Sequence, residues 1–297
     1  MPPQVIQIAS MDDPRVAPYR DVKDRQLLPQ FVQRRGEDSV RKAGEDGPRG
    51  PGMFMAEGEV VVRMLLRSTY RTVSMLCTPK RWEDVRDEVE HAAAGATVYV
   101  AEPPVLEGIV GFHLHRGLLA LGERRDLAAA ADLMAACEPG RPLVVLEDLT
   151  NHDNIGGVFR CAAALGAAGV ILSPRCGDPL YRKALRVSVG CALAVPWTFA
   201  QEWPGTLGAC RTAGLTVAGL ALGEGTRVLK DVAADLRGRR VALVLGSEGP
   251  GLTAGALGAC EVRVLIPMIA GVDSLNVATT AGIALYEFGC GNGASPN

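Results

Sequence analysis

The sequence lacks several patterns that would assign a protein to a common class at once. Its 297 residues contain no apolar run of about 18 residues, so no membrane-spanning helix is expected. The amino-terminal segment has no basic region followed by a long apolar stretch, so no signal peptide is expected. The formal net charge is −2, so any binding of a polyanion would depend on a local cationic patch.

Metal-ligand patterns are also absent, although the chain has eight cysteines. The cysteines are spread singly with no Cys-x-x-Cys pair, which favours small buried side chains in a reducing compartment over a zinc site. We therefore predict a cytoplasmic protein without a bound metal. The histidines His113, His115 and His152 have no carboxylate or cysteine at a matching offset, which favours ordinary strand and loop positions.

Changes in composition divide the chain into four parts. Hydrophobic residues make up 48%, enough for a sizeable core. Residues 1–52 are rich in charge, proline and glycine, which is typical of an extension and linker. The predicted parts are an extension and charged linker at 1–52, a small α/β domain at 53–122, a connecting helix at 123–140 and a larger α/β domain at 141–297.

Short apolar runs alternate with amphipathic stretches in the larger domain. Strands buried on both faces read as continuous apolar runs, and helices between them imply parallel pairing. We therefore predict an α/β fold with a parallel sheet and helices on both faces. The expected strands are 143–146, 169–172, 215–220, 241–245 and 262–266.

Three separated segments each end an apolar run with a polar cluster, and they are Asn154–Arg160, Leu245–Gly251 and Ile266–Val277. Strand ends are where ligands bind in α/β sheets. The three clusters therefore predict one composite site built from distant parts of the chain.

The glycines at 249–254 satisfy the dinucleotide-binding pattern, but only weakly. The helix expected behind them is short and contains Gly255 and Gly258, and the next strand ends in Ile266-Pro267 where an acidic residue would hold a ribose. A nicotinamide or flavin site remains a weaker alternative. No phosphate loop of the form Gly-x-x-x-x-Gly-Lys-Ser/Thr is present in the sequence.

Single residues in the clusters each allow more than one role. Asp153 or Asn154 can cap a helix that begins at Ile155, and Ser274 can cap the last helix. Arg160 suits a phosphate or ribose contact, although a surface arginine is the simpler reading. Asn276, in a first helical turn, can bind an oxyanion. Glu248 either pairs with a cation or is solvated.

Together the three segments resemble the signature motifs of the SpoU/TrmH-type RNA 2′-O-ribose methyltransferases, a branch of the SPOUT class. The first resembles Asn-x-Gly-x-x-x-Arg, the second Leu-Gly-x-Glu-Gly-x-Gly, and the third Ile-Pro-Met followed by Ser-Leu-Asn-Val. The matching residues are Asn154, Gly156 and Arg160; Leu245, Gly246, Glu248, Gly249 and Gly251; Ile266–Met268 and Ser274–Val277. One departure is Asn151-His-Asp-Asn154, where the family often has Asp-Pro-x-Asn.

The resemblance implies a fold, a donor and an assembly. It implies a carboxyl-terminal trefoil knot, a homodimer with sites at the subunit interface, and S-adenosylmethionine as methyl donor. The segments at 54–58 and 111–117 are similar to the ribosomal-protein-L30e-like substrate domain. Donor contacts are implied at Gly246, Ile266, Leu275, Met268 and Leu220. Catalytic roles toward a ribose 2′-hydroxyl are implied for Arg160, Asn154, Glu248, Ser274 and Asn276.

Structured RNA, either tRNA or rRNA, is the implied partner. We expect RNA contacts at Arg182, Lys183, Arg186 and Arg116, although a solvated helix face explains the first three equally well. Three alternatives stay open, namely a non-catalytic RNA-binding protein on the same fold, a base-methylating SPOUT enzyme and a nicotinamide oxidoreductase.

Overall fold

The computed structural model describes residues 2–20, 27, 52–111, 117–269 and 274–289. The chain divides into two compact units, and each is discontinuous in sequence. The first comprises Met1–Asp126 with Leu180–Leu193, and the second comprises Leu127–Pro179 with Ala194–Asn297.

The first unit is built on a five-stranded mixed sheet in the order β1-β4-β3-β5-β2. Its strands are β1 Gln4–Ile8, β2 Met53–Glu57, β3 Thr72–Cys77, β4 Thr97–Ala101 and β5 Leu118–Glu123. β1 and β3 run parallel to β4, whereas β5 is antiparallel to β3 and β2. Its helical elements are η1 Pro14–Tyr19, α1 Glu59–Arg67, α2 Pro79–Ala92, α3 Pro103–Val110, α6 Arg182–Val187 and η4 Cys191–Leu193.

The amino-terminal residues differ from the expected extension and linker. β1 adds an edge strand to the sheet, and Val16 and Tyr19 of η1 are buried in the core. The Tyr19 hydroxyl and the Ser74 hydroxyl form a hydrogen bond of 2.8 Å. Most residues of the segment are exposed, and a few apolar side chains, including Ile8, Val16 and Tyr19, anchor it to the core. Residues 28–51, the centre of the predicted linker, lie outside the described ranges.

The second unit contains the predicted parallel sheet with helices on both faces. Its seven strands have the order β10-β12-β9-β11-β6-β7-β8, and every neighbouring pair is parallel. The strands are β6 Leu143–Leu146, β7 Gly169–Leu172, β8 Trp197–Phe199, β9 Thr216–Leu220, β10 Arg227–Val228, β11 Val241–Leu245 and β12 Val262–Leu265. Three neighbouring inner strands, β11, β6 and β7, are fully buried, as continuous apolar runs require.

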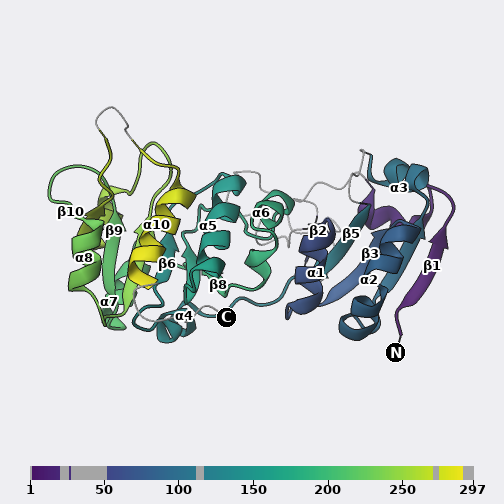
Figure 1. The fold of residues 1–297 in the computed structure, drawn as a ribbon, viewed down its shortest axis with the longest axis horizontal. Helices are drawn as coiled ribbons and strands as arrows, with labels where there is room; N and C mark the ends of the chain where they lie inside the picture. Colours follow the sequence, from purple (N-terminus) through teal and green to yellow (C-terminus); the bar gives the residue numbers. More distant parts are fainter. Residues whose placement is uncertain (1, 21–26, 28–51, 112–116, 270–273, 290–297) are drawn as a thin grey trace, which may run out of the picture. The chain divides into compact units, whose positions relative to one another are not determined.

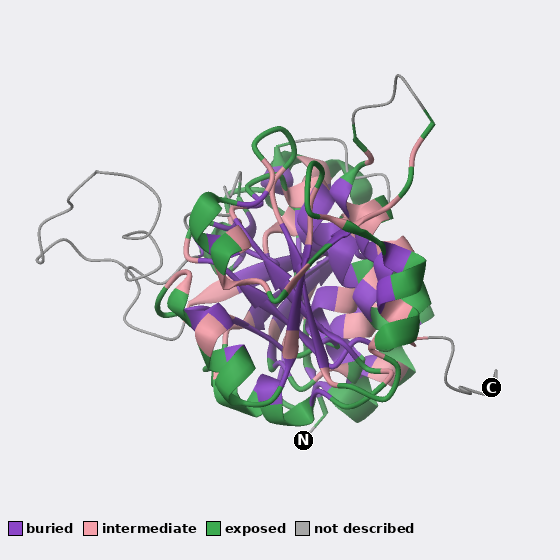
Figure 2. Ribbon diagram, turned by 90° about the vertical axis from the view of Figure 1, so that its left-hand side faces the viewer, coloured by how far each residue is buried: buried purple, intermediate pink, exposed green. Residues whose placement is uncertain are grey.

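Two groups of helices cover the sheet of the second unit (Figure 1). α4, α7 and α9 pack on a buried cluster that includes Leu143, Val145 and Val244. α5 and α8 pack against α10, which also contacts β11. Figure 2 shows the buried strands between helices whose outer sides are exposed. The helices are α4 Ala130–Ala136, α5 His152–Ala164, α7 Gly205–Thr212, α8 Leu229–Asp235, α9 Ala254–Ala259 and α10 Val277–Gly289.

Two expectations about chain organisation are corrected. The connecting helix predicted at 123–140 is only the seven-residue α4, because β5 continues to Glu123 and an irregular segment follows. Residues 180–193, predicted to lie in the larger domain, group with the first unit. Arg182 and Arg186 form ion pairs with Glu57 at the end of β2, and Gly190 lies against Met64 of α1.

None of the helices in the described ranges combines the length and apolar character that a membrane span requires. Within the same ranges, no three His, Cys, Asp or Glu side chains are grouped as metal ligands would be.

Candidate functional site

The three polar segments meet at one edge of the second unit's sheet. Each follows the carboxyl end of a strand, namely β6, β11 or β12, and β11 pairs with both β6 and β9. The chain passes from β6 outward to β8 and then returns to β9 on the other side of β6, so the strand order reverses there. Such a reversal leaves a crevice at the carboxyl ends of the strands, where α/β proteins bind ligands.

A cavity of about 290 Å³ opens at this edge. All five residues predicted to hold the donor line it, together with Glu248 and Ser274 of the predicted catalytic set. Its lining residues are Leu220, Ala221, Leu222, Leu245–Leu252, Leu257, Val264, Ile266, Met268, Ser274, Leu275, Val277 and Thr280. Apolar side chains and the backbone of glycine-rich loops therefore surround one space, with a carboxylate and a hydroxyl at its margin.

The glycine-rich loop after β11 folds back on itself. The Gly251 N–H donates to the Ser247 carbonyl at 3.0 Å, and both Gly249 and Gly251 have positive φ, of 93° and 69°. A Cβ at Gly246 would lie 2.4 Å from the Gly251 carbonyl carbon. Only glycine allows this approach, so Gly246 shapes the cavity wall by lacking a side chain.

Asn276 connects the three segments by hydrogen bonds. Its Nδ2 donates to Asn154 Oδ1 at 2.9 Å and to Glu248 Oε1 at 3.0 Å. Its Oδ1 accepts from the Ala278 N–H at 2.9 Å. We call this arrangement the Asn276 junction. It links the start of α5, the glycine-rich loop and the start of α10 beside the cavity.

The two helix caps differ from those predicted. α5 begins three residues earlier than expected, at His152, and its cap is Asn151, whose side chain accepts from the Asp153 N–H. Asn154 is therefore buried in the first turn, where its side chain is available to Asn276. α10 is capped by Asn276, while Ser274 is an exposed residue at the cavity.

Arg160 lies outside the Asn276 junction. It is exposed on α5 and makes no hydrogen bond or ion pair with any residue the structure describes. The segment around it packs closely on α10, since a Cβ at Gly157 would lie 2.6 Å from the Ala278 Cβ. The guanidinium of Arg160 is thus presented to solvent on a helix that is fixed against α10.

The described residues among the expected RNA-binding cations belong to the first unit and do not line the cavity. Arg182 and Arg186 of α6 form ion pairs with Glu57 within the first unit. Lys183 lies on the same helix. Arg116 falls outside the described residues.

One functional candidate was missed by the sequence interpretation. Glu147, directly after β6, is fully buried and accepts hydrogen bonds from Thr253 and Trp203. The signal was present, because an acidic residue that ends a continuous apolar strand at a predicted ligand edge is unusual.

The thiols near the site are protected rather than reactive. Burial raises the pKa of Cys161 on α5, and the Cys161 thiol donates to the Ala278 carbonyl at 3.4 Å. Burial also raises the pKa of Cys260, which follows α9, to about 11. Thiols with raised pKa hold their protons near neutral pH, so neither suits a nucleophile.

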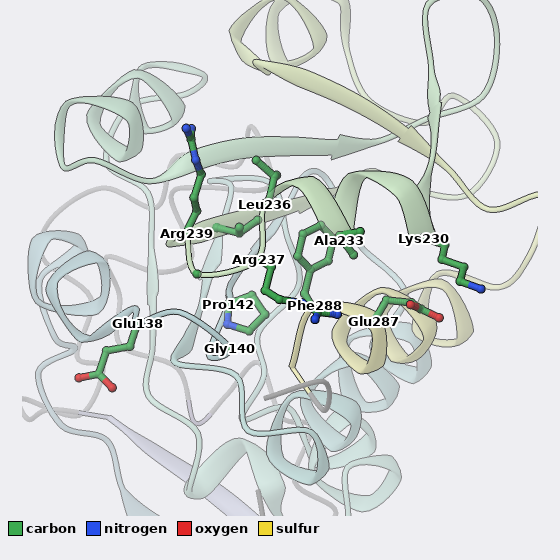
Figure 3. Close-up of a pocket in the computed structure, with 13 residues that line it drawn as sticks. Glu138, Gly140, Pro142, Lys230, Ala233, Leu236, Arg237, Arg239, Glu287 and Phe288 are labelled. Carbon is green, nitrogen blue, oxygen red and sulfur yellow. The ribbon is translucent and has the colours of Figure 1, made fainter. Parts of the chain in front are cut away.

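A smaller cavity of about 140 Å³ lies at the opposite edge of the same sheet (Figure 3). It is lined by Pro142, just before β6, and by Val241, the first residue of β11. In Figure 3 the Arg237 and Phe288 side chains lie near its centre, while Glu138 extends away. Because α/β proteins bind ligands at the carboxyl ends of strands, the larger cavity is the candidate site.

In comparisons with known proteins, this chain is similar to RNA methyltransferases. Residues 141–286 match the model of the SpoU rRNA Methylase family. An uncharacterised tRNA/rRNA methyltransferase of Mycobacterium bovis is 37% identical over 95% of this chain and 91% of its own length. A 23S rRNA (guanosine-2′-O-)-methyltransferase of Ralstonia nicotianae is 33% identical over 70% of this chain and 82% of its own length. A crystal structure of an AdoMet-bound rRNA methyltransferase from Sinorhizobium meliloti superposes with a TM-score of 0.71, at 25% identity, over 96% of this chain and 97% of that one.

Proposed function

Because the chain belongs to the SpoU rRNA methylase family, we propose that it transfers a methyl group from S-adenosylmethionine to a ribose 2′-hydroxyl of structured RNA. The observation that carries the proposal is the Asn276 junction beside the 290 Å³ cavity. It joins a residue from each of the three segments at the carboxyl ends of the strands, where α/β proteins generally bind ligands.

The residues around the cavity fit the donor. Gly246, Ile266 and Leu275 line the cavity. In this proposal their backbone carbonyls and amides contact the edges of the adenine ring. Leu220 and Met268 add apolar surface for the faces of the ring. A Cβ at Gly246 would clash with the Gly251 backbone, so this wall needs a glycine at 246 to keep its conformation.

S-adenosylmethionine supplies an electrophilic methyl group on a sulfonium when bound. The ribose oxygen forms the new bond to the methyl carbon as the carbon–sulfur bond breaks, and the hydroxyl proton passes to solvent. A neutral hydroxyl is a weak nucleophile, so the protein must orient it and stabilise developing negative charge. Glu248, Asn154, Ser274 and Asn276 orient the ribose in this proposal. Arg160 stabilises the oxyanion, because a guanidinium is a cation that carries several N–H donors.

The exposed position of Arg160 leads to a proposed homodimer. Arg160 is outside its own Asn276 junction and is open to solvent. We therefore place it toward the donor cavity of a second copy of the chain, so that each site takes the cavity from one subunit and Arg160 from the other. The proposal includes the trefoil knot of the SPOUT class, a ribosomal-protein-L30e-like first unit that holds RNA, and a cytoplasmic location.

Product mapping tests the proposal. The protein is incubated with S-adenosylmethionine labelled in its methyl group and with unmodified total tRNA or rRNA, and the RNA is digested to nucleosides. We expect the label in a 2′-O-methylribose nucleoside. Label on a base would show that the protein is a base-methylating SPOUT enzyme. If the protein binds the donor but no RNA becomes labelled, a non-catalytic RNA-binding protein is favoured.

A further inference from the structure

Glu147 is a buried carboxylate whose hydrogen-bond partners are all neutral in the described part of the chain. Its side chain is 0% exposed. Oε1 accepts from Trp203 Nε1 at 2.5 Å and from Thr253 Oγ1 at 2.7 Å, and Oε2 accepts from the Thr253 N–H at 2.8 Å. Burying a carboxylate is unfavourable unless its oxygens are satisfied, so three directed donors indicate a specific structural use.

Two of the three donors belong to Thr253, which ends the glycine-rich loop. Leu252, the residue before it, lines the donor cavity, and Thr253 itself caps α9 by accepting from the Ala256 N–H at 3.2 Å. The other end of the loop is anchored through β11, because the Glu147 N–H donates to the Leu245 carbonyl at 2.8 Å. Glu147 therefore holds both ends of the loop, one by its backbone and the other by its side chain.

Between these anchors the loop is shaped by the hydrogen bond from the Gly251 N–H to the Ser247 carbonyl and by the hydrogen bond that Glu248 accepts from Asn276. The loop contains three glycines, two of them with positive φ, and Glu248, Gly249 and Pro250 are exposed. Glycine-rich segments lose much conformational entropy when they are ordered. A carboxylate that fixes where the loop ends reduces the number of conformations that donor binding must exclude.

We infer that Glu147 is a positioning residue that pre-organises the glycine-rich loop 246–253 for the methyl donor. This inference rests on the donor cavity proposed above. Glu147 acts through Thr253 and does not line the cavity itself. Glutamine is the sharpest replacement, because it keeps the size of the side chain but has one acceptor oxygen. Its NH₂ group must then face either the Thr253 N–H or the Trp203 N–H, so one donor is left unpaired.

Three measurements on the Glu147→Gln variant test the inference. Calorimetry is expected to show S-adenosylmethionine binding weakened about tenfold, if the competent loop population falls to about a tenth. In the donor-free protein, amides of 246–253 should exchange with deuterium faster while the amides of β6 and β11 keep their protection. In steady-state kinetics the KM for the donor should rise, with the KM for RNA unchanged.

Matched variants separate this role from general destabilisation. Trp203→Phe removes one donor but keeps both contacts of Thr253, so it should weaken donor binding less than Glu147→Gln. Tyr19→Phe, which loses the Ser74 hydrogen bond in the first unit, controls for lost stability without a change at the loop. Donor affinity and loop exchange in Glu147→Gln equal to those of the wild type would overturn the inference.

A separate variant tests whether this cavity binds the donor at all. Gly246→Ala places a Cβ against the Gly251 backbone and should block the donor whatever Glu147 does. If Gly246→Ala binds the donor normally, the cavity assignment is wrong. If Gly246→Ala loses binding and Glu147→Gln keeps it with unchanged exchange, only the positioning role fails.

Discussion

Asn276 is the residue on which the three polar segments converge, so its replacement tests the site directly. Asn276→Ala removes the hydrogen bonds to Asn154 and Glu248 and also the cap of α10. We expect methyl transfer to fall on the order of 100-fold, as misplaced catalytic groups do. Loss of the cap should lower the free energy of unfolding by about 1 kcal/mol.

Asn276→Asp separates the two roles of this residue. An aspartate still accepts from the Ala278 N–H, so the cap of α10 should be kept. It donates no hydrogen bond and brings a second carboxylate to Glu248, so methyl transfer should fall as in Asn276→Ala. If the aspartate variant retains wild-type turnover, Asn276 serves only as a helix cap.

Arg160 gives a second prediction at the residue scale. Arg160→Ala is expected to keep the affinity for S-adenosylmethionine, because the proposed role of Arg160 is to stabilise the ribose oxyanion and not to hold the donor. Turnover should fall at least about 100-fold, the usual effect of removing one group that stabilises an oxyanion. Arg160→Lys keeps the charge but loses the planar fork, so it should recover only part of the rate. Full activity of Arg160→Ala would exclude the assigned role.

The sequence predicted where the site residues lie better than which contacts they make. The polar clusters stood out because glycine and amide residues directly follow continuous apolar strands. The cap of α10 was misassigned to Ser274, because both Ser274 and Asn276 are good capping residues and only the backbone decides between them. Glu147 was missed because its donors, Thr253 and Trp203, are far away in the sequence.

At the scale of elements, the close packing of α5 on α10 holds the Asn276 junction in place. Gly157→Ala would bring its Cβ to 2.6 Å from the Ala278 Cβ. Such overpacking should destabilise the protein by about 1–3 kcal/mol and lower turnover, because α10 carries Asn276 at its start. Urea unfolding and initial rates measure the two effects.

A second substitution makes this prediction specific. The Gly157→Ala, Ala278→Gly double variant removes the clash, so it should recover turnover. A small loss of stability remains, because glycine in a helix is less favourable than alanine. If turnover in the double variant is as low as in Gly157→Ala alone, the clash between the two helices does not cause the loss of turnover.

The strands that the sequence marks most clearly are fully buried, whereas two of the strands that were missed are largely exposed. The buried strands β6, β7 and β11 are continuous apolar runs that no other element explains. β10 has two exposed residues, and β1 is mostly exposed at a sheet edge, so neither shows a buried pattern. The grouping of α6 with the first unit depends on ion pairs with Glu57, which lies over a hundred residues earlier in the chain.

At the scale of the whole molecule, buried thiols in both units should make the folded protein less stable at alkaline pH. Burial raises the pKa of Cys77 from its ordinary 9.0 to about 12 and that of Cys210 to about 11. The folded protein therefore holds these protons more tightly than the unfolded chain. The stabilisation that these protonated thiols give the folded protein is fully present below about pH 9. It is lost as the pH rises through the pKa values that the thiols have in the folded state.

The measurement is urea unfolding between roughly pH 8 and pH 11. The free energy of unfolding should fall across this range, and the fall should be smaller in Cys210→Ala, because alanine has no proton to lose. Other groups titrate here as well, so the difference between the two proteins is the decisive quantity. A difference independent of pH would show that the Cys210 thiol has an ordinary pKa when folded.

The proposed dimer predicts that two inactive variants restore each other. Arg160→Ala lacks the oxyanion group, and Gly246→Ala has a blocked donor cavity. If each site combines the cavity of one subunit with Arg160 of the other, a mixed dimer has one doubly defective site and one intact site. Random pairing makes half of the dimers mixed, so co-refolded protein should recover about a quarter of wild-type activity. If both groups act within one subunit, every site carries a defect and the mixture stays inactive.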